Sequence, residues 1–240
     1  MLTHHCSCSL PFRFHLSTKD VCHIFLDTLK LMAAALSPMI VFYTRNEVAK
    51  TLPREFKNFK RIRCIIDCSE LFIQRPSDLK LQAATWSDYK SHNTLKFLVA
   101  ITPQGSIAYV SDLYGGRTSD RHIVRDCGFL KGINPHDEVM ADRGFGLREE
   151  FMLKGARLII PPASKGRAQM SSGNVQNTKK VANVRIHVER VIRRMKCFRF
   201  LSNTISVSML RHCDDVVKVV AAITNLQGPI VKSWTRMSSK

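Results

Sequence analysis

Arg63-Cys64-Ile65-Ile66-Asp67-Cys68 is the stretch that decides the fold, because it is a short apolar run rich in branched residues and predicts a buried β-strand. A second run of this kind, Glu138-Val-Met-Ala-Asp142, also closes on an aspartate, and the pattern stops at Gly144. An aspartate in an apolar strand is costly unless its charge is paired or bound to a metal ion. We therefore expect the two strands to bring two carboxylates to one edge of a sheet.

Further strands and helices are expected on both sides of these two runs. Strands are predicted at 71–73, 94–102, 106–113 and 157–160, with Pro103-Gln-Gly105 as a hairpin turn and Gly115-Gly116 as a break. Helices are predicted at 17–36 with Ser17 as N-cap, at 45–51, from Asp120 towards Cys127, and at 147–153, 175–198 and 214–226. Strands followed by alternating strands and helices predict a mixed α/β layer fold behind a small N-terminal helical segment.

The charge of the chain points to a polyanionic partner. The formal net charge is +18, and residues 143–240 carry 19 Lys and Arg against 5 Asp and Glu. Glu189 is the only acidic residue between Glu150 and Asp214, among 13 basic ones. Such a region binds the phosphates of a nucleic acid by releasing counterions. A membrane surface would also attract it, but no long basic amphipathic helix with a bulky apolar face accompanies the charge. An RNA-binding protein is disfavoured by the aromatic content of 8% and by the lack of an aromatic-rich ribonucleoprotein motif.

The cysteines and the apolar runs indicate a protein that works in a reducing compartment and outside membranes. The eight cysteines form no C-x-x-C pairs, so the sequence does not support a zinc ribbon. No signal peptide opens the chain, and its most apolar run, Leu31 to Tyr43, is too short to span a bilayer. We expect reduced cysteines, no membrane association, and a location in cytosol or nucleus.

Three carboxylates carry the chemical hypothesis: Asp67, Asp142 and Glu189, the last on the basic helix. Together they would repel one another, and Mg²⁺ or Mn²⁺ would remove that repulsion because these ions prefer oxygen ligands. Two such ions can activate a water or a 3′-hydroxyl and stabilise the leaving oxygen of a phosphodiester. Lys and Arg around the acids would hold the DNA backbone.

Each of the three acids also has an ordinary structural interpretation. Asp67 could cap a turn, and Asp142 could form an Asx turn in Ala-Asp-Arg-Gly. Glu189 lies four residues from both Arg185 and Arg193, which suits an ion-pair ladder on a helix surface. The spacing does not decide between this ladder and a metal site.

Several of these motifs together resemble the DDE superfamily endonuclease domain, and within it the Harbinger-like transposases and their THAP-associated relatives. The similarity extends from about residue 14 to 228. It is carried by the following motifs, in this order: Cys-Ile-Ile-Asp67-Cys-Ser-Glu-Leu-Phe-Ile, Lys-Phe-Leu-Val-Ala-Ile-Thr-Pro-Gln-Gly105, Gly116-Arg-Thr-Ser-Asp120, Met-Ala-Asp142-Arg-Gly-Phe and Asn183-Val-Arg-Ile-His-Val-Glu189-Arg.

The resemblance implies an RNase H-like mixed sheet flanked by helices, with Asp67, Asp142 and Glu189 as the metal-binding catalytic triad. It implies a transposase-type endonuclease that cuts and joins DNA with Mg²⁺ or Mn²⁺, and Asp120 matches a supporting acidic motif. We expect the basic residues of the helix to bind DNA: Arg185, Arg190, Arg193, Arg194 and Lys196. The alternative is a domesticated or relic transposase that binds DNA without cutting it.

The resemblance also suggests a domain division and partners. Residues 1–60 would be a helical segment, 61–228 the endonuclease domain and 229–240 a C-terminal tail. Phe14 to Phe25 resembles the later part of a helix-turn-helix whose partner helices would lie upstream, so we expect an N-terminally truncated copy. A lone helix cannot be oriented in the major groove, so a separate DNA-binding partner protein or a homo-oligomer would serve recognition. The nucleus is the expected location.

Overall fold

A seven-stranded mixed sheet forms the centre of the molecule, in a computed structural model that describes residues 9–161, 185–228 and 230. The strands are β1 (Ile62–Phe72), β2 (Trp86–Ser87), β3 (His92–Ile101), β4 (Ile107–Val110), β5 (Tyr114–Gly115), β6 (Glu138–Met140) and β7 (Arg157–Ile159). The main order is β2-β3-β1-β6-β7, and β4 and β5 both pair with β3. The predicted mixed α/β sheet is thereby confirmed.

β1 is the central strand and joins the antiparallel and parallel halves of the sheet. It pairs antiparallel with β3 from Ile65↔Ile101 to Phe72↔Thr94, and parallel with β6 at Ile65↔Met140. β1 is longer than the sequence pattern suggests, because the run expected as a separate strand at 71–73 continues it. Long pairing with β3 overrides the polar residues that interrupt the apolar pattern.

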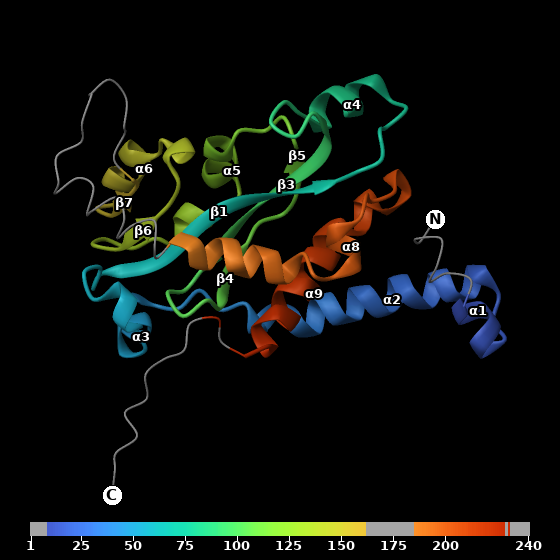
Figure 1. Ribbon diagram of the computed structural model, residues 1–240, viewed down its shortest axis with the longest axis horizontal. Helices are drawn as coiled ribbons and strands as arrows, with labels where there is room; N and C mark the ends of the chain where they lie inside the picture. Colours follow the sequence, from blue (N-terminus) through green and yellow to red (C-terminus); the bar gives the residue numbers. More distant parts are fainter. Residues whose placement is uncertain (1–8, 162–184, 229, 231–240) are drawn as a thin grey trace, which may run out of the picture.

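Helices cover both faces of the sheet (Figure 1). They are α1 (Ser9–Phe14), α2 (Thr18–Leu36), α3 (Arg45–Lys50), α4 (Leu79–Thr85), α5 (Asp120–Asp126), α6 (Arg148–Leu153), α8 (Arg199–Ser202) and α9 (Cys213–Leu226). Short 3₁₀ turns are Ser37–Met39, Arg54–Phe56, Phe129–Gly132, Arg143–Phe145 and Val207–His212. Residues 185–195 form a further helix, unlabelled and orange in Figure 1. The part of the helix expected at 175–184 lies outside the described residues.

Alternation along the strands divides the interior into two cores. Ile65 and Leu71 of β1 pack in one core with α2, the 185–195 helix and α9, whereas Cys64 and Ile66 pack in the other with α5 and α6. Successive side chains of a strand point to opposite faces of a sheet, so odd-numbered residues of β1 face the 185–195 helix. This parity decides which polar residues of β1 can meet that helix.

The ends of the helices follow capping chemistry that the sequence reveals only in part. Ser17 accepts a hydrogen bond from the backbone N–H of Asp20, which confirms it as the N-cap of α2. The N-cap of α5 is Ser119, so Asp120, expected as the cap, lies in the first turn. There its carboxylate still suits the positive end of the helix.

Three short helices, α1, α4 and α8, and two short strands, β2 and β5, were not predicted. α1 and α4 lack a long apolar period, and Gly115, expected as part of a break, pairs with Leu95 of β3. A Cβ on Gly115 would lie 2.3 Å from the carbonyl oxygen of Ala84, so glycine permits this close approach of α4 to the sheet.

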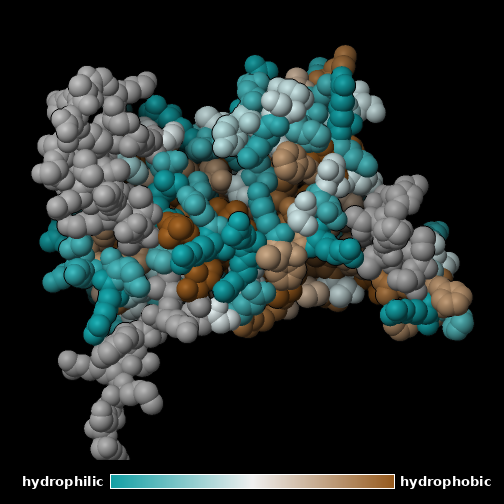
Figure 2. Space-filling view, in the orientation of Figure 1, coloured by the Kyte–Doolittle hydropathy of each residue, from teal (hydrophilic) through white to brown (hydrophobic). Residues whose placement is uncertain are grey.

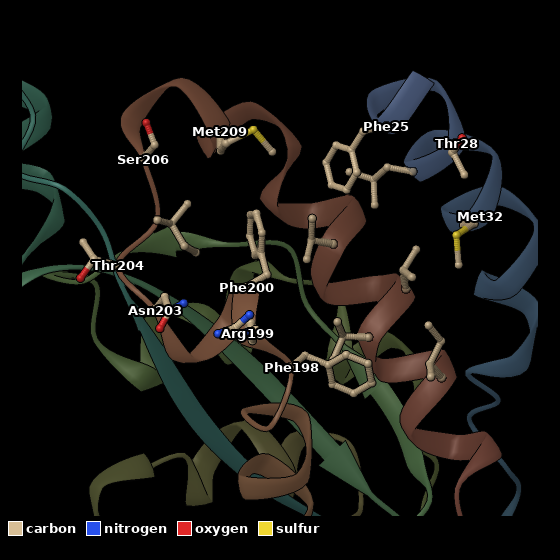
Figure 3. Close-up of a pocket in the computed structure, with 16 residues that line it drawn as sticks. Phe25, Thr28, Met32, Phe198, Arg199, Phe200, Asn203, Thr204, Ser206 and Met209 are labelled. Carbon is tan, nitrogen blue, oxygen red and sulfur yellow. The ribbon is translucent and has the colours of Figure 1, made fainter. Parts of the chain in front are cut away.

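α2 packs against α9 and encloses an apolar pocket with it. Leu29 and Ala33 of α2 belong to the same core as the sheet. The pocket has a volume of about 440 Å³, and Phe25 and Met32 of α2 line it opposite Phe198 and Phe200 (Figure 3). These contacts describe how the segments pack, and the domain boundary expected near residue 60 stays a prediction.

The apolar stretch at α2 is longer than the run at 31–43, from which we predicted that no segment of the chain spans a membrane. In the described residues, Thr18–Met39 is helical, long and apolar enough to cross a membrane by length and composition alone. A core helix of a soluble protein passes the same test, and two residues of this helix are core residues.

Candidate functional site

The register of the sheet places Asp67 and Asp142 at the same level and on the same face. Ile65 of β1 pairs with Met140 of β6, and each aspartate lies two residues beyond its strand's partner in this pair. Two residues is one full period of a strand, so the side chain of Asp67 projects to the face covered by the 185–195 helix. Asp142 lies just past the end of β6, and its contact with Arg185 of that helix places it on the same side. The sequence prediction that two strands carry carboxylates to one place therefore follows from parallel pairing.

The 185–195 helix brings Glu189 to this face through Arg185. Nη1 of Arg185 donates to Oδ1 of Asp142 at 3.1 Å, and Nη2 donates to Oε1 of Glu189 at 3.3 Å. Each carboxylate contacts a different Nη atom, so the guanidinium lies between them. The buried residues Val188, Val191 and Met195 fix the other side of the helix in the core. The expected ion pair between Arg185 and Glu189 is present, and Arg185 forms a second ion pair with Asp142, just past the end of β6.

Asp67 is the most buried of the three acids. Its Oδ1 accepts a hydrogen bond of 2.9 Å from the backbone N–H of Cys68, and among the described residues no ion pair reaches it. Burial raises the pKa of Asp67 to about 6, while the charge of Arg185 and the Cys68 hydrogen bond lower it and the charges of Asp142 and Asp120 raise it. Asp67 therefore holds its negative charge at an energetic cost that a nearby cation would remove.

Asp120 belongs to a second ionic cluster on the opposite face of β1. Its carboxylate lies 3.2 Å from Nζ of Lys96, which also lies 3.6 Å from Glu70. Burial lowers the pKa of Lys96, but Asp120 and Glu70 outweigh it and raise the pKa. Glu70 is largely buried and also accepts a hydrogen bond from Thr94 Oγ1 at 2.8 Å. Only the pairing of β1 with β3 reveals that cluster, because Glu70 and Lys96 are partners in the register.

The five basic residues expected to bind DNA are placed differently from one another. Arg190 and Arg193 are exposed. Arg185 turns inward to the carboxylates, Lys196 donates to the carbonyl of Glu70 at 2.9 Å, and Arg194 donates to the carbonyl of Gly228 at 2.6 Å. Periodicity alone could not separate these roles, since all five lie on one short basic stretch.

The three candidate acids share one electrostatic environment without forming a set of metal ligands. In residues 9–161, 185–228 and 230, no group of three or more His, Cys, Asp and Glu side chains is arranged to hold a metal ion. The guanidinium of Arg185 is instead paired with both Asp142 and Glu189. The donor set nevertheless fits a cation, because a desolvated carboxylate and two carboxylates gathered on a positive charge are oxygen ligands that Mg²⁺ and Mn²⁺ prefer.

The apolar pocket beside α2 is separate from this chemistry. Its lining residues come from α2, α8, α9 and the turns next to them, and none of the three acids is among them. Apolar lining suits packing or an apolar ligand, whereas a phosphodiester needs cations. The three acids and the nearby arginines therefore remain the candidate site, although this apolar pocket lies elsewhere.

Asp67→Asn is expected to stabilise the protein at pH 8 in EDTA by about 1–3 kcal/mol. The folded protein raises the pKa of Asp67, so it holds that proton more tightly than the unfolded chain does. This stabilisation is complete below the unfolded pKa of about 4 and is lost as the pH rises through about 6. The gain from the substitution should therefore vanish near pH 4, as urea denaturation at the two pH values would measure.

Asp120→Asn is the matched control for that experiment. Its carboxylate is paired with Lys96, so removing the charge should lower the stability or leave it unchanged at pH 8. Equal gains for Asp67→Asn at pH 4 and pH 8 would mean that burial of the charge is not the cause.

Comparison with known proteins identifies the family. No curated protein matches the chain. Among solved structures, the piggyBac transposase in a synaptic complex with hairpin DNA is similar at 10% identity and a TM-score of 0.43; the match covers 69% of this chain and 46% of that one. The family model of the DDE superfamily endonuclease matches residues 66–225, which is more than half of the chain and includes all three candidate acids. The chain belongs to the DDE superfamily endonuclease family.

Proposed function

We propose that the protein is a transposase-type DNA endonuclease that uses divalent cations at Asp67, Asp142 and Glu189. This proposal depends on one observation: Asp142 and Glu189 both accept hydrogen bonds from the guanidinium of Arg185. Asp67 lies beside them, since Asp67 and Asp142 each follow by two residues the paired residues Ile65 and Met140. Ordinary capping of turns would not gather acids from two strands and a helix on one face. Membership of the endonuclease family supports the same conclusion.

In this proposal each residue has a distinct task. Asp67, Asp142 and Glu189 would hold Mg²⁺ or Mn²⁺, which supplies an activated water or 3′-hydroxyl and stabilises the leaving oxygen. Backbone pairing fixes Asp67 within β1, Asp142 directly follows the short strand β6, and the core side of the 185–195 helix fixes Glu189. Asp120 has no ligand role in this proposal, because its carboxylate is paired with Lys96.

The DNA backbone is proposed to lie along the exposed side of the 185–195 helix. Figure 2 shows hydrophilic side chains along much of this helix, with a few hydrophobic ones between them. Arg190 and Arg193 lie there on the same helix as Glu189, so phosphate binding and candidate chemistry share one surface.

Replacing Arg190 and Arg193 together by alanine is expected to weaken DNA binding at all sequences and to flatten its salt dependence. The slope of log K against log salt should fall by about two units, one for each lost phosphate contact. Fluorescence anisotropy of a labelled duplex across a salt series would measure it. Lys19→Ala with Lys30→Ala on α2 removes the same charge elsewhere, and an equal change for this pair would show that only net charge matters.

The direct test of the proposed function is a plasmid-nicking assay with the purified wild-type chain. We expect nicked circles with Mg²⁺ or Mn²⁺ and none with EDTA or with Ca²⁺ alone. Joining of a supplied 3′-hydroxyl end to the plasmid would add strand transfer to nicking. Cleavage that persists in EDTA would rule the proposal out.

A relic that binds DNA without cutting it is the second candidate function. The ion pairs of Arg185 favour it, since they occupy carboxylate oxygens that a cation would need. In that case DNA binding would be as strong in EDTA as in Mg²⁺, and no condition would yield nicked plasmid.

The remaining proposals concern the setting of the protein. We propose a Harbinger-like subfamily, a nuclear location, a helical segment over residues 1–60, and an oligomer or a partner protein that takes part in sequence-specific binding. The proposed DNA substrate and the basic 185–195 helix support the nuclear location. A pull-down with labelled terminal-repeat DNA, with and without added partner, would test the last.

A further inference from the structure

Arg185 lies deeper in the site than the acids that it pairs with. Its side chain is 16% exposed, whereas those of Asp142 and Glu189 are 49% and 57% exposed. The guanidinium therefore approaches the two carboxylates from inside, and solvent reaches them from outside. A hydrated cation can arrive at the acids without first moving the helix.

Helix spacing explains only half of this arrangement. The pair with Glu189 is four residues away on the same helix, as in any surface ladder. The pair with Asp142 joins the helix to the end of β6, 43 positions away in the chain. Arg185 also acts on Asp67 through its charge, so one guanidinium influences all three candidate acids.

One hydrogen-bond donor of Arg185 is left without a partner among the described residues, unlike those of an arginine with a purely structural role. Its Nε is buried, and no hydrogen-bond partner for this atom is found in the described part of the chain. A buried donor without a partner costs free energy, which lowers the cost of moving the side chain. The pairing is therefore one that a stronger competitor can replace.

We propose that Arg185 is an exchangeable counter-cation, which pairs with Asp142 and Glu189 when no divalent cation is bound and gives both carboxylates up to an arriving cation. The inference rests on the proposed cation site. The guanidinium and a divalent ion compete for the same oxygens, and the ion brings twice the charge. Arg185 then acts as a positioning residue that sets the affinity for the cation, and its freed donors can turn to a phosphate.

The test is a titration with Mn²⁺ alone, following the signal of free Mn²⁺ by electron paramagnetic resonance. Arg185→Ala should bind Mn²⁺ about tenfold more tightly than wild type, because a difference of roughly 1.4 kcal/mol in competition is a factor of ten. Arg185→Lys, which keeps the charge, should stay close to wild type. Arg199→Ala, an exposed arginine on α8, is the control for one lost charge and should not differ from wild type.

The outcomes separate this inference from the proposed function. If wild type binds Mn²⁺ and Arg185→Ala binds it equally or more weakly, the counter-cation idea fails and the cation site stands. If neither protein binds Mn²⁺, both fail. A role in stability alone would lower the melting temperature of Arg185→Ala in EDTA without tightening the binding of Mn²⁺.

A measurement on the wild-type protein removes any dependence on the folding of variants. Phenylglyoxal labels accessible arginines, and mass spectrometry gives the labelled fraction at each position. Mn²⁺ should increase labelling at Arg185 by several-fold and leave Arg199 unchanged. Labelling of Arg185 that stays constant or falls with Mn²⁺ would overturn the proposal.

Discussion

Asp67→Asn, Asp142→Asn and Glu189→Gln are each expected to lower cation-dependent nicking of DNA by about 100-fold or more. Loss of a group that only supports a metal ligand already costs 10- to 100-fold, so loss of a ligand should cost at least as much. The substitutions keep the shape of each side chain and remove only the charge. Initial rates of plasmid nicking under saturating Mn²⁺ would measure the effect.

DNA binding should survive these substitutions, since Arg190 and Arg193 lie on the exposed side of the helix. Asp67→Asn should be both inactive and more stable, which separates loss of chemistry from loss of fold. Glu149→Gln on α6 removes an exposed carboxylate and serves as the control with wild-type rates. Nicking by the three variants at the rate of this control would disprove the assignment of the acids.

Arg63→Met is expected to destabilise the fold by about 3–5 kcal/mol, because it leaves the carboxylate of Asp137 buried without its partner. Arg63 and Asp137 are 4% and 2% exposed, and Nη1 of Arg63 contacts Oδ2 of Asp137 directly. Nε of Arg63 also donates to the carbonyl of Tyr43 at 2.9 Å, and its guanidinium lies 4.4 Å from the ring centroid of Phe42. This residue thus ties β1 to the turn before β6 and to the segment after α2.

The double variant Arg63→Met with Asp137→Leu tests the cause of that loss. Removing both charges should recover much of the stability, since apolar side chains replace a buried pair at little cost. The neighbouring pair Arg157 and Glu138 is the control: its arginine is 77% exposed, and Arg157→Ala should cost less than about 1 kcal/mol. Urea denaturation of the wild type and the three variants gives the changes in stability, and a loss below about 1 kcal/mol for Arg63→Met would contradict the prediction.

The two ion pairs also show why charged residues of one sequence differ in importance. Arg63 stands at the start of the apolar run that predicts β1, where a sequence pattern treats it as the polar edge of a strand. Its burial follows from the packing of residues that are more than 70 positions apart, Arg63 and Asp137. No local pattern contains that information.

The sequence by itself determined the longer elements and pointed to the candidate acids. Apolar runs gave β1 and β6, the period of α9 gave its helix, and the aspartates at 67 and 142 stood out because a charge in an apolar strand needs a partner. The motifs together gave the family, which the match over residues 66–225 confirms. These are local properties, set by the side-chain periods of strands and helices.

Only the tertiary structure decided how those acids are related. The parallel register of β1 and β6 sets Asp67 and Asp142 at one level, and the packing of the 185–195 helix turns Arg185 inward to them. The same packing leaves Arg190 and Arg193 outside, although all three arginines look alike in the sequence. The physical reason is that strand register and helix rotation are fixed by contacts between distant segments, which no stretch of the chain encodes alone.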